Sequence, residues 1–298
     1  MVCEVLVEIK AKNIDKTFTY HIPDSLSNDI SVGKRVLVPF GNRKIEGFVL
    51  NILEHMELNY PLKDVVEVID DEPVLNSELL ELGKFISKKT LCNLINCYQV
   101  MLPTALKARK GLEVPKKYKI YLKLNGETED IIKNIKNDKQ LEIINILSEK
   151  EVEKKVCTDI SVSSVKTLLD HKYIIEEKKE VYRIDEEEQL ETKRNILTEE
   201  QDNAIKKITS AFYTFKPFLL HGVTGSGKTE VYMNIIEKVL SDKKEALVLV
   251  PEISLTPQFV ANFKKRFGNK IAILHSGLSD GEKYDEWRKI VRKEVSIV

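Results

Sequence analysis

The sequence predicts a multidomain protein of mixed α+β and α/β class. Residues 1–70 alternate apolar and polar side chains with the period of β-strands, and residues 138–184 combine helical periodicity with strand-like runs. From residue 197 onward, short apolar runs alternate with helical stretches, which is typical of α/β domains with a parallel sheet. A chain of 298 residues has room for two or three domains, and we expect them at 1–125, 126–190 and 191–298.

The composition excludes several classes of protein. The 47 Lys and Arg residues balance 47 Asp and Glu residues, which argues against a uniformly basic nucleic-acid binder but not against a local basic patch. No apolar run reaches the ~18–20 residues of a membrane-spanning helix, and the N-terminus lacks the pattern of a secretory signal. The four cysteines form no C-x-x-C pair and are interpreted as reduced thiols of a cytoplasmic protein. We therefore expect no membrane partner.

The N-terminal part is expected to form a small antiparallel barrel or sandwich. Glycines supply turns between four short runs of alternating apolar residues. Helical periodicity begins after Ser77, and a second helical stretch runs from Leu91 to Met101. Between Lys107 and Lys123, seven basic residues oppose only Glu113, so this basic segment is a candidate DNA-binding surface. The predicted strands cover residues 5–9, 18–22, 35–38 and 45–53.

Residues 138–184 have the pattern of a winged-helix domain. Two helical faces, at 141–147 and 162–169, precede two strand-like runs at 173–175 and 181–184. The charged residues between these runs are predicted to form the turn of a hairpin. Helices followed by a two-stranded wing are typical of a DNA-binding winged helix, but such a fold also mediates protein contacts. A helical connector without DNA contact is the alternative. The acidic run from Asp185 to Glu191 is predicted to be a solvated linker.

The most specific motif is a complete P-loop, G-x-x-x-x-G-K-T, at residues 222–229. An apolar run at 218–220, interpreted as a strand, precedes it, and a helix-forming stretch at 230–240 follows. Its glycines let successive backbone N–H groups face phosphate oxygens, and the helix N-terminus adds partial positive charge. We predict that Lys228 binds the β- and γ-phosphates of ATP and that Thr229 binds Mg²⁺, which makes these two the catalytic candidates. The predicted nucleotide-binding residues of the loop are Gly222, Val223, Thr224, Gly225, Ser226, Gly227, Lys228 and Thr229.

Gln201 has two interpretations of equal weight. Thr198 and Gln201 have the spacing of a capping box, in which Gln201 only stabilises the start of a helix. Alternatively, the Gln201 amide pairs with the adenine edge of the nucleotide. Gln201 therefore joins the predicted cofactor-binding residues.

Two further segments reveal a family resemblance. Residues 249–258 read LVPEISLTPQ, and residues 274–279 read LHSGLS. Together with the Gln201 region and the P-loop, this order resembles superfamily 2 helicases, and its wording is similar to the PriA (primosomal protein N′) family. Residues 18–23 and 38–43 resemble the N-terminal DNA-binding domain of that family, so the resemblance covers essentially the whole chain. Thr19 stands where the family usually has Asp.

The resemblance implies a function and a domain order. It implies a 3′-end DNA-binding domain at 1–125, a winged-helix domain and linker at 126–190, and a partial RecA-like first helicase lobe at 191–298. The implied activity is that of an ATP-dependent 3′→5′ DNA helicase that restarts stalled replication forks and initiates primosome assembly. The implied partners are forked and single-stranded DNA, primosome proteins and single-stranded DNA-binding proteins. The family's acidic Walker B motif, zinc-binding cysteines and second lobe are expected after Val298, so zinc is expected only there.

Two other functions stay open. One is a DNA-binding protein whose P-loop binds nucleotide without hydrolysing it. The other is an unrelated small-molecule kinase, which would not need the segment at 251–258 or an N-terminal barrel.

The candidate DNA contacts come from both ends of the chain. By resemblance, Pro251 and Glu252 grip single-stranded DNA, while polar side chains such as His275 bond phosphate oxygens without reading sequence. Alternatively, His275 is a strand-end residue whose ring forms its hydrogen bonds with the backbone. Phe18 and Tyr20 share a strand face and serve either as core or as stacking platforms. The full set is Phe18, Tyr20, Arg35, Arg43, Lys44, Pro251, Glu252, His275 and Ser276. A helical face with Trp287 and Ile290 is expected to pack against the C-terminal lobe.

Overall fold

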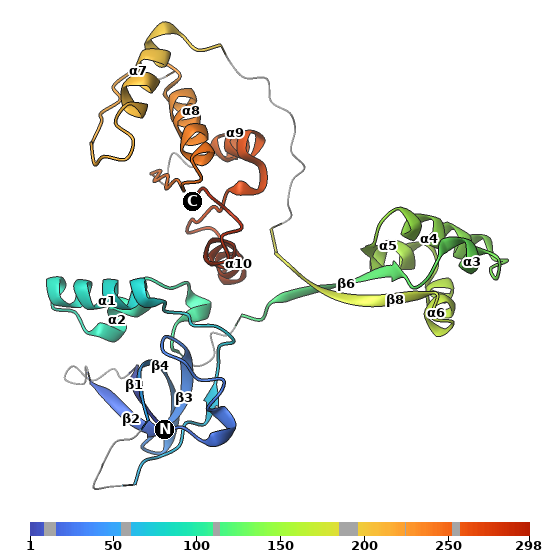
Figure 1. Ribbon diagram of the computed structural model, residues 1–298, viewed down its shortest axis with the longest axis horizontal. Helices are drawn as coiled ribbons and strands as arrows, with labels where there is room; N and C mark the ends of the chain where they lie inside the picture. Colours follow the sequence, from blue (N-terminus) through green and yellow to red (C-terminus); the bar gives the residue numbers. More distant parts are fainter. Residues whose placement is uncertain (9–15, 55–60, 110–113, 185–195, 224, 252–256) are drawn as a thin grey trace. The chain divides into compact units, whose positions relative to one another are not determined.

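The computed structural model describes residues 1–8, 16–54, 61–109, 114–184, 196–223, 225–251 and 257–298. Contacts divide the chain into two compact units, one of Met1–Val114 with Glu186–Val298 and the other of Pro115–Asp185. Strand β6 (Lys117–Leu124), which we had assigned to the N-terminal domain, therefore belongs to the second unit (Figure 1). The predicted acidic linker lies outside the described residues.

The N-terminal part of the first unit is built on a five-stranded antiparallel sheet in the order β2-β1-β4-β3-β5. The four strands predicted from alternation are confirmed, although Ile9 lies outside the described residues. The turn between β3 and β4 uses Gly41 at φ +57°, a left-handed conformation that suits glycine. The strands are β1 (Val2–Val7), β2 (Thr17–His21), β3 (Arg35–Phe40), β4 (Arg43–Leu53) and β5 (Glu67–Val68).

Two helices follow this sheet, α1 (Ser77–Thr90) and α2 (Leu94–Val100). Asn76 caps α1, because its side chain accepts a hydrogen bond from the N–H of Leu79 at 2.9 Å. Leu91 adopts a left-handed φ of 56° and ends α1, so the second helix begins three residues later than the predicted start at Leu91. Short 3₁₀ turns lie at Asp24–Leu26 (η1) and Thr104–Leu106 (η2).

The first unit has separate apolar cores. One lies within the sheet and includes Cys3, Tyr20 and Val36. Another joins Leu6 and Phe48 of the sheet to Tyr98 of α2. Tyr284 and Trp287 of α10 (Asp280–Val291) pack against this second cluster. We expected Trp287 to pack against its own lobe. Among the described contacts, it packs instead against an N-terminal core.

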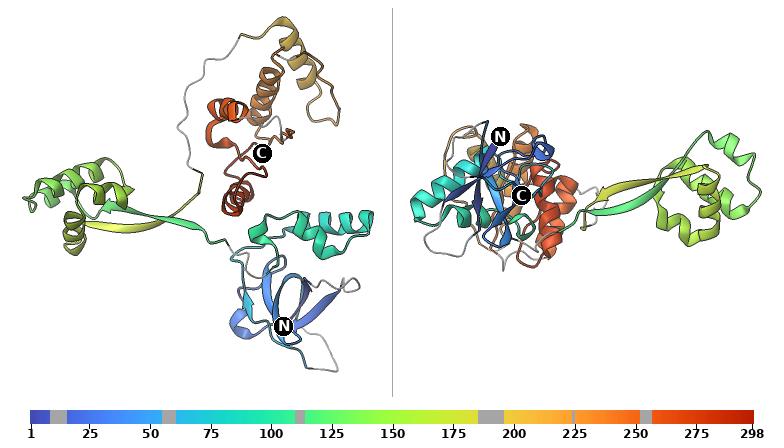
Figure 2. Two further views of the ribbon diagram at one scale, coloured as in Figure 1. Left: turned by 180° about the vertical axis from the view of Figure 1, so that it is seen from behind. Right: turned by 90° about the horizontal axis from the view of Figure 1, so that it is seen from below.

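The second unit carries a three-stranded sheet in the order β7-β6-β8, with helices gathered at one end of a long twisted ribbon (Figures 1 and 2). The predicted hairpin at 173–184 is wrong. Residues Ile174–Val181 form one continuous strand, β8, which pairs with β6 rather than folding back on itself. The other elements are α3 (Thr128–Ile132), α4 (Asp138–Glu149), β7 (Val152–Glu153), α5 (Lys154–Ile160) and α6 (Val162–Asp170). The winged-helix assignment stays a prediction.

Ion pairs between the elements of this ribbon explain why the charged residues of β8 form a strand. They also neutralise part of the predicted basic segment. Lys123 of β6 forms an ion pair with Glu177 of β8, and Lys119 pairs with Glu153 of β7, each at 2.8 Å. Opposite charges on facing strands stabilise a sheet, so a charged run can extend as a strand. The lysines that we counted as a basic patch are thus partly neutralised by glutamates 34 and 54 residues away along the chain.

The C-terminal part of the first unit has helices α7 (Glu199–Thr209), α8 (Lys228–Ser241), α9 (Pro257–Phe267) and α10, with a 3₁₀ turn at Gly268–Lys270. Ile297 bridges in parallel to both Ala246 and Ile271, which agrees with the predicted parallel arrangement. The predicted strand at 218–220 is not formed in the described structure, and Leu219 is 91% exposed. A strand needs a hydrogen-bonded neighbour, and no described residue provides one for this segment.

Within the described parts of the chain, no helix is long and apolar enough to cross a bilayer.

Candidate nucleotide site and DNA contacts

The P-loop forms a tight turn that leads directly into α8. Gly225 and Gly227 have φ values of +81° and +74°, which residues with a side chain rarely adopt. Gly227 is the N-cap of α8, so the helix begins at Lys228 and its N-terminus directly follows the loop. Thr224 lies outside the described residues. Gly225 and Gly227 therefore adopt backbone conformations that favour glycine, and binding of phosphate by the loop stays a prediction.

Lys228 holds the two ends of the loop together. Its ammonium donates to the carbonyl oxygens of Gly222 at 2.7 Å and Val223 at 2.8 Å. Thr229 follows in the first turn of the helix and is partly buried. A compact positive charge, a helix N-terminus and a hydroxyl in one turn fit the phosphates and Mg²⁺ of a nucleotide. Among the described residues, no group of three or more His, Cys, Asp or Glu side chains forms a metal site.

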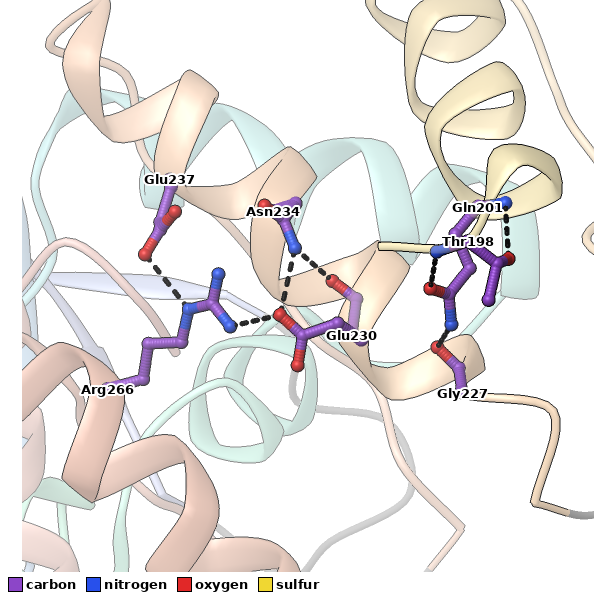
Figure 3. A network of polar contacts seen from close by, with 7 residues as sticks. All are labelled: Thr198, Gln201, Gly227, Glu230, Asn234, Glu237 and Arg266. Carbon is purple, nitrogen blue, oxygen red and sulfur yellow. Dashed lines mark hydrogen bonds and ion pairs between the residues drawn. The ribbon is translucent and has the colours of Figure 1, made fainter. Parts of the chain in front are cut away.

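Gln201 caps α7 and also reaches the P-loop. Its Oε1 accepts from the Thr198 N–H at 2.9 Å, while Thr198 Oγ1 accepts from the Gln201 N–H at 3.3 Å. Its Nε2 lies 3.4 Å from the carbonyl oxygen of Gly227 (Figure 3). A Cβ on Gly227 would lie only 2.2 Å from that Nε2. The capping interpretation is confirmed, and pairing with adenine stays a prediction.

An ion-pair network connects α8 to α9 beside the loop (Figure 3). Arg266 of α9 contacts Glu230 through Nη1, and its Nε donates to Glu237 Oε1 at 2.9 Å. Asn234 donates to the Glu230 carboxylate at 3.0 Å. Burial of Arg266 would by itself lower the pKa of its guanidinium. The hydrogen bonds to Glu237 and Glu230 outweigh that effect and leave the pKa raised.

The aromatic candidates of the N-terminal sheet lie in or against the core. Tyr20 is 4% exposed, and its hydroxyl donates to the Pro39 carbonyl at 3.2 Å. Phe18 is partly buried and meets Phe40 edge to face, with ring centroids 5.2 Å apart. Burial of Tyr20 and the packing of Phe18 against this core favour the core interpretation.

The basic candidates divide into one buried and two exposed side chains. The guanidinium of Arg35 is buried against Asp70 and against the carbonyls of Ala105 and Lys107. Arg43 and Lys44 are exposed at the turn that opens β4. Because the donors of Arg35 are used inside the protein, Arg43 and Lys44 are the basic pair available to a phosphate.

The C-terminal DNA candidates are less fully described. Pro251 is exposed and Glu252 lies outside the described residues. The ring of His275 is used by the backbone, since its Nδ1 accepts from the Gly277 N–H at 3.1 Å. Ser276 is exposed, and its carbonyl accepts from Lys283 at 3.4 Å. The turn at 275–277 thus holds His275 in place by a local hydrogen bond.

Comparison with known proteins decides the relationship. Residues 4–103 match the family model described as the 3′ DNA-binding domain of PriA, and residues 194–297 match the one described as the res subunit of type III restriction enzymes. The chain is 40% identical to the replication restart protein PriA of Bacillus subtilis over 99% of its own length. It is 32% identical to PriA of Chlamydia muridarum, again over 99% of its length.

The chain belongs to the PriA family. It spans 46% of the Bacillus subtilis protein and 40% of the Chlamydia muridarum protein, so it matches less than half of these relatives. A segment of 80 residues is 60% identical to PriA of Synechocystis. In this PriA-family chain, the first matched region contains the five-stranded sheet with α1 and α2, and the second contains the P-loop and Arg266.

Sequence reasoning missed two charged residues of the PriA-family chain. Asp70 and Arg266 have no motif, and their partners lie 35 and 36 residues away. Neither separation is a helical or strand period, so only the tertiary fold brings these pairs together.

Proposed function

We propose that the chain is the DNA-binding part and first helicase lobe of an ATP-dependent 3′→5′ DNA helicase. In this proposal the whole protein recognises stalled replication forks, restarts them and initiates primosome assembly. The observation that carries it is a complete P-loop at the start of α8 in the same chain as a region matching a 3′ DNA-binding domain. The PriA relatives are named replication restart proteins, which supports the fork as the substrate.

The nucleotide step uses a short series of groups. Lys228 leaves the carbonyls of Gly222 and Val223 to meet the β- and γ-phosphates, and the N–H groups at the start of α8 complete the cradle. The Thr229 hydroxyl binds Mg²⁺, and Gln201 faces the adenine from the start of α7. ATP, when bound, supplies the phosphoanhydride whose hydrolysis drives strand separation. Water positioning and further charge stabilisation are assigned to the part of the PriA relatives that this chain does not match, and zinc is expected there as well.

The DNA step uses exposed groups that do not read sequence. Arg43 and Lys44 contact phosphates near the strand 3′ end, and the winged-helix unit adds contacts to the duplex. Pro251, Glu252, His275 and Ser276 grip the single strand. Primosome and single-stranded DNA-binding proteins are the protein partners, and the site of action is the cytoplasm.

The DNA part of the proposal is tested by fluorescence anisotropy with a forked duplex and a blunt duplex. We expect tighter binding to the fork, with an affinity that falls steeply as salt rises. Substituting Arg43 and Lys44 together with alanine is expected to reduce the salt slope by about two, one per phosphate contact. The matched control is the exposed pair Lys206 and Lys207 of α7, which changes net charge equally. Equal, salt-insensitive binding to both duplexes would contradict the proposal.

The alternative is a DNA-binding protein whose P-loop holds nucleotide without hydrolysis. We expect residues 1–298 to bind Mg·ATP but to show negligible turnover, with or without DNA. DNA-stimulated hydrolysis near ordinary enzyme rates, about 1–10³ s⁻¹, would show that the catalytic groups are already complete in this chain. Hydrolysis by a chain extended to the length of the PriA relatives separates the helicase from the alternative.

A further inference from the structure

Arg266 is a buried cation that joins α9 to the helix of the P-loop. Its side chain is 9% exposed, and the side chains of Glu230 and Glu237 are 14% and 27% exposed. Its Nη2 is buried without a hydrogen-bond partner among the described residues. A buried guanidinium with incomplete hydrogen bonding is costly, and an apolar pair of similar volume would serve packing at least as well. The arrangement therefore calls for a role beyond packing.

The position of Glu230 suggests what that role is. Glu230 directly follows Thr229 and lies in the first turn of α8, the turn that faces the phosphates in the proposed function. A free carboxylate there would repel a nucleotide, because like charges a few ångströms apart at a protein surface repel each other. Figure 3 shows the Glu230 carboxylate turned toward Arg266 and away from Gly227. Asn234 fixes it from within α8, at 3.0 Å.

We propose that Arg266 is a positioning residue of the nucleotide site. Its guanidinium holds and neutralises the Glu230 carboxylate on the α9 side of α8, which leaves the first turn of the helix positive enough to receive the phosphates of a Mg²⁺–nucleoside triphosphate. This inference rests on the proposed function. The hydrogen bonds to both glutamates raise the pKa of the Arg266 guanidinium, so Arg266 carries its positive charge when a nucleotide binds.

The test is a double-mutant cycle on the whole 298-residue chain, with a fluorescent ATP analogue and Mg²⁺ as the probe. Arg266→Gln is expected to weaken binding of the analogue about tenfold, because the Glu230 carboxylate then loses its positively charged partner. Arg266→Gln combined with Glu230→Gln is expected to restore the affinity to within about threefold of wild type. Glu230→Gln alone is expected to bind at least as tightly as wild type. Thermal unfolding of each variant is measured alongside.

The matched control is Lys289→Gln in α10. It removes another buried cation, which pairs with Glu286 at 3.0 Å, and leaves α8 unchanged. We expect this variant to lose thermal stability with less than a twofold change in affinity. A merely structural Arg266 would behave in the same way as Lys289.

Three results would overturn the inference. The first is that Arg266→Gln binds the analogue as tightly as wild type. The second is that the double variant binds as weakly as Arg266→Gln. The third is that Glu230→Gln loses more than threefold in affinity. If Arg266→Gln does not fold, the affinity of Glu230→Gln for the analogue tests the inference alone, because this variant keeps Arg266. Failure of the wild-type chain to bind the analogue overturns the proposed nucleotide site and this inference with it. If the wild-type chain binds the analogue but the variants do not show the expected affinities, only this inference is overturned.

Discussion

Arg35 and Asp70 form a buried ion pair in which the guanidinium meets both carboxylate oxygens. Arg35 Nη2 lies 2.7 Å from Asp70 Oδ1 and Nε lies 3.1 Å from Oδ2, and the two side chains are 6% and 8% exposed. Nη1 of the same guanidinium donates to the carbonyls of Ala105 at 3.0 Å and Lys107 at 3.1 Å. One side chain of β3 thus ties together the segment after β5 and the segment at η2.

Arg35→Ala is therefore expected to destabilise the N-terminal sheet strongly. Removing one partner of a buried pair leaves an uncompensated charge, which typically costs about 3–5 kcal/mol in the free energy of unfolding. Urea denaturation measures this loss. The matched control, Arg43→Ala, changes an exposed arginine and is expected to stay within about 0.5 kcal/mol of wild type. Wild-type stability with a selective loss of DNA affinity in Arg35→Ala would instead assign Arg35 to DNA.

Gly83→Ala is expected to destabilise the packing of α1 on α2. Alanine normally stabilises a helix interior by about 1 kcal/mol relative to glycine. Here the new Cβ would lie 2.2 Å from Cε1 of Tyr98, a ring that is fully buried. Overpacking of a core costs about 1–3 kcal/mol, so the clash is expected to exceed the helix gain. In a Tyr98→Leu background, Gly83→Ala should become neutral or stabilising. An equal loss in both backgrounds would contradict contact with the ring.

Cys92 is expected to be the one cysteine that a maleimide labels quickly in the folded chain. Cys92 is exposed, whereas Cys3, Cys97 and Cys157 are buried. Burial raises the pKa of the Cys3 thiol to about 12, so about one molecule in ten thousand carries the reactive thiolate at pH 8. Burial also raises the pKa of Cys157. Mass spectrometry should find one added label before unfolding and four after it. A second fast-labelled thiol would contradict the described burial.

Local patterns in the sequence were sufficient where the structure depends on neighbours in the chain. Alternation along β1 to β4 follows from one buried face, and the cap at Thr198 is a local hydrogen bond. The P-loop glycines likewise need only their own backbone conformation. For the same reason, the capping role of Gln201 could be predicted but its approach to Gly227 could not.

Features that depend on distant partners were the ones that sequence reasoning missed. The charged run in β8 was interpreted as a turn because the lysines that pair with its glutamates lie in other elements. Lys123 of β6 pairs with Glu177, and Lys154 of α5 pairs with Glu176. Arg35 was interpreted as a candidate DNA contact because Asp70, its buried partner, carries no motif. Trp287 was assigned to its own lobe because periodicity identifies an apolar face but not the surface that covers it. Each error replaced a tertiary contact with a local explanation.

Lys228→Ala is expected to weaken nucleotide binding strongly while leaving fork binding nearly unchanged. Loss of a charge-assisted contact to phosphate costs about 1.5–3 kcal/mol, or about 10- to 150-fold in affinity. Lys228→Arg should also bind weakly, because a planar guanidinium does not fit a loop closed on a compact ammonium at 2.7 and 2.8 Å. Titration with a fluorescent ATP analogue and anisotropy with a forked duplex, both on residues 1–298, measure the two affinities.

Lys238→Ala, an exposed lysine in the last turn of the same helix, is the matched control for Lys228→Ala. It changes the net charge equally and should leave both affinities within about twofold, because exposed charges this far apart are largely screened. Lys228 also closes the loop through the carbonyls of Gly222 and Val223, so the alanine variant must keep the wild-type unfolding temperature for the comparison to hold. A tenfold loss of fork affinity without nucleotide would make Lys228 a DNA contact. Undiminished binding of the ATP analogue would remove the P-loop assignment, and the helicase proposal depends on that assignment.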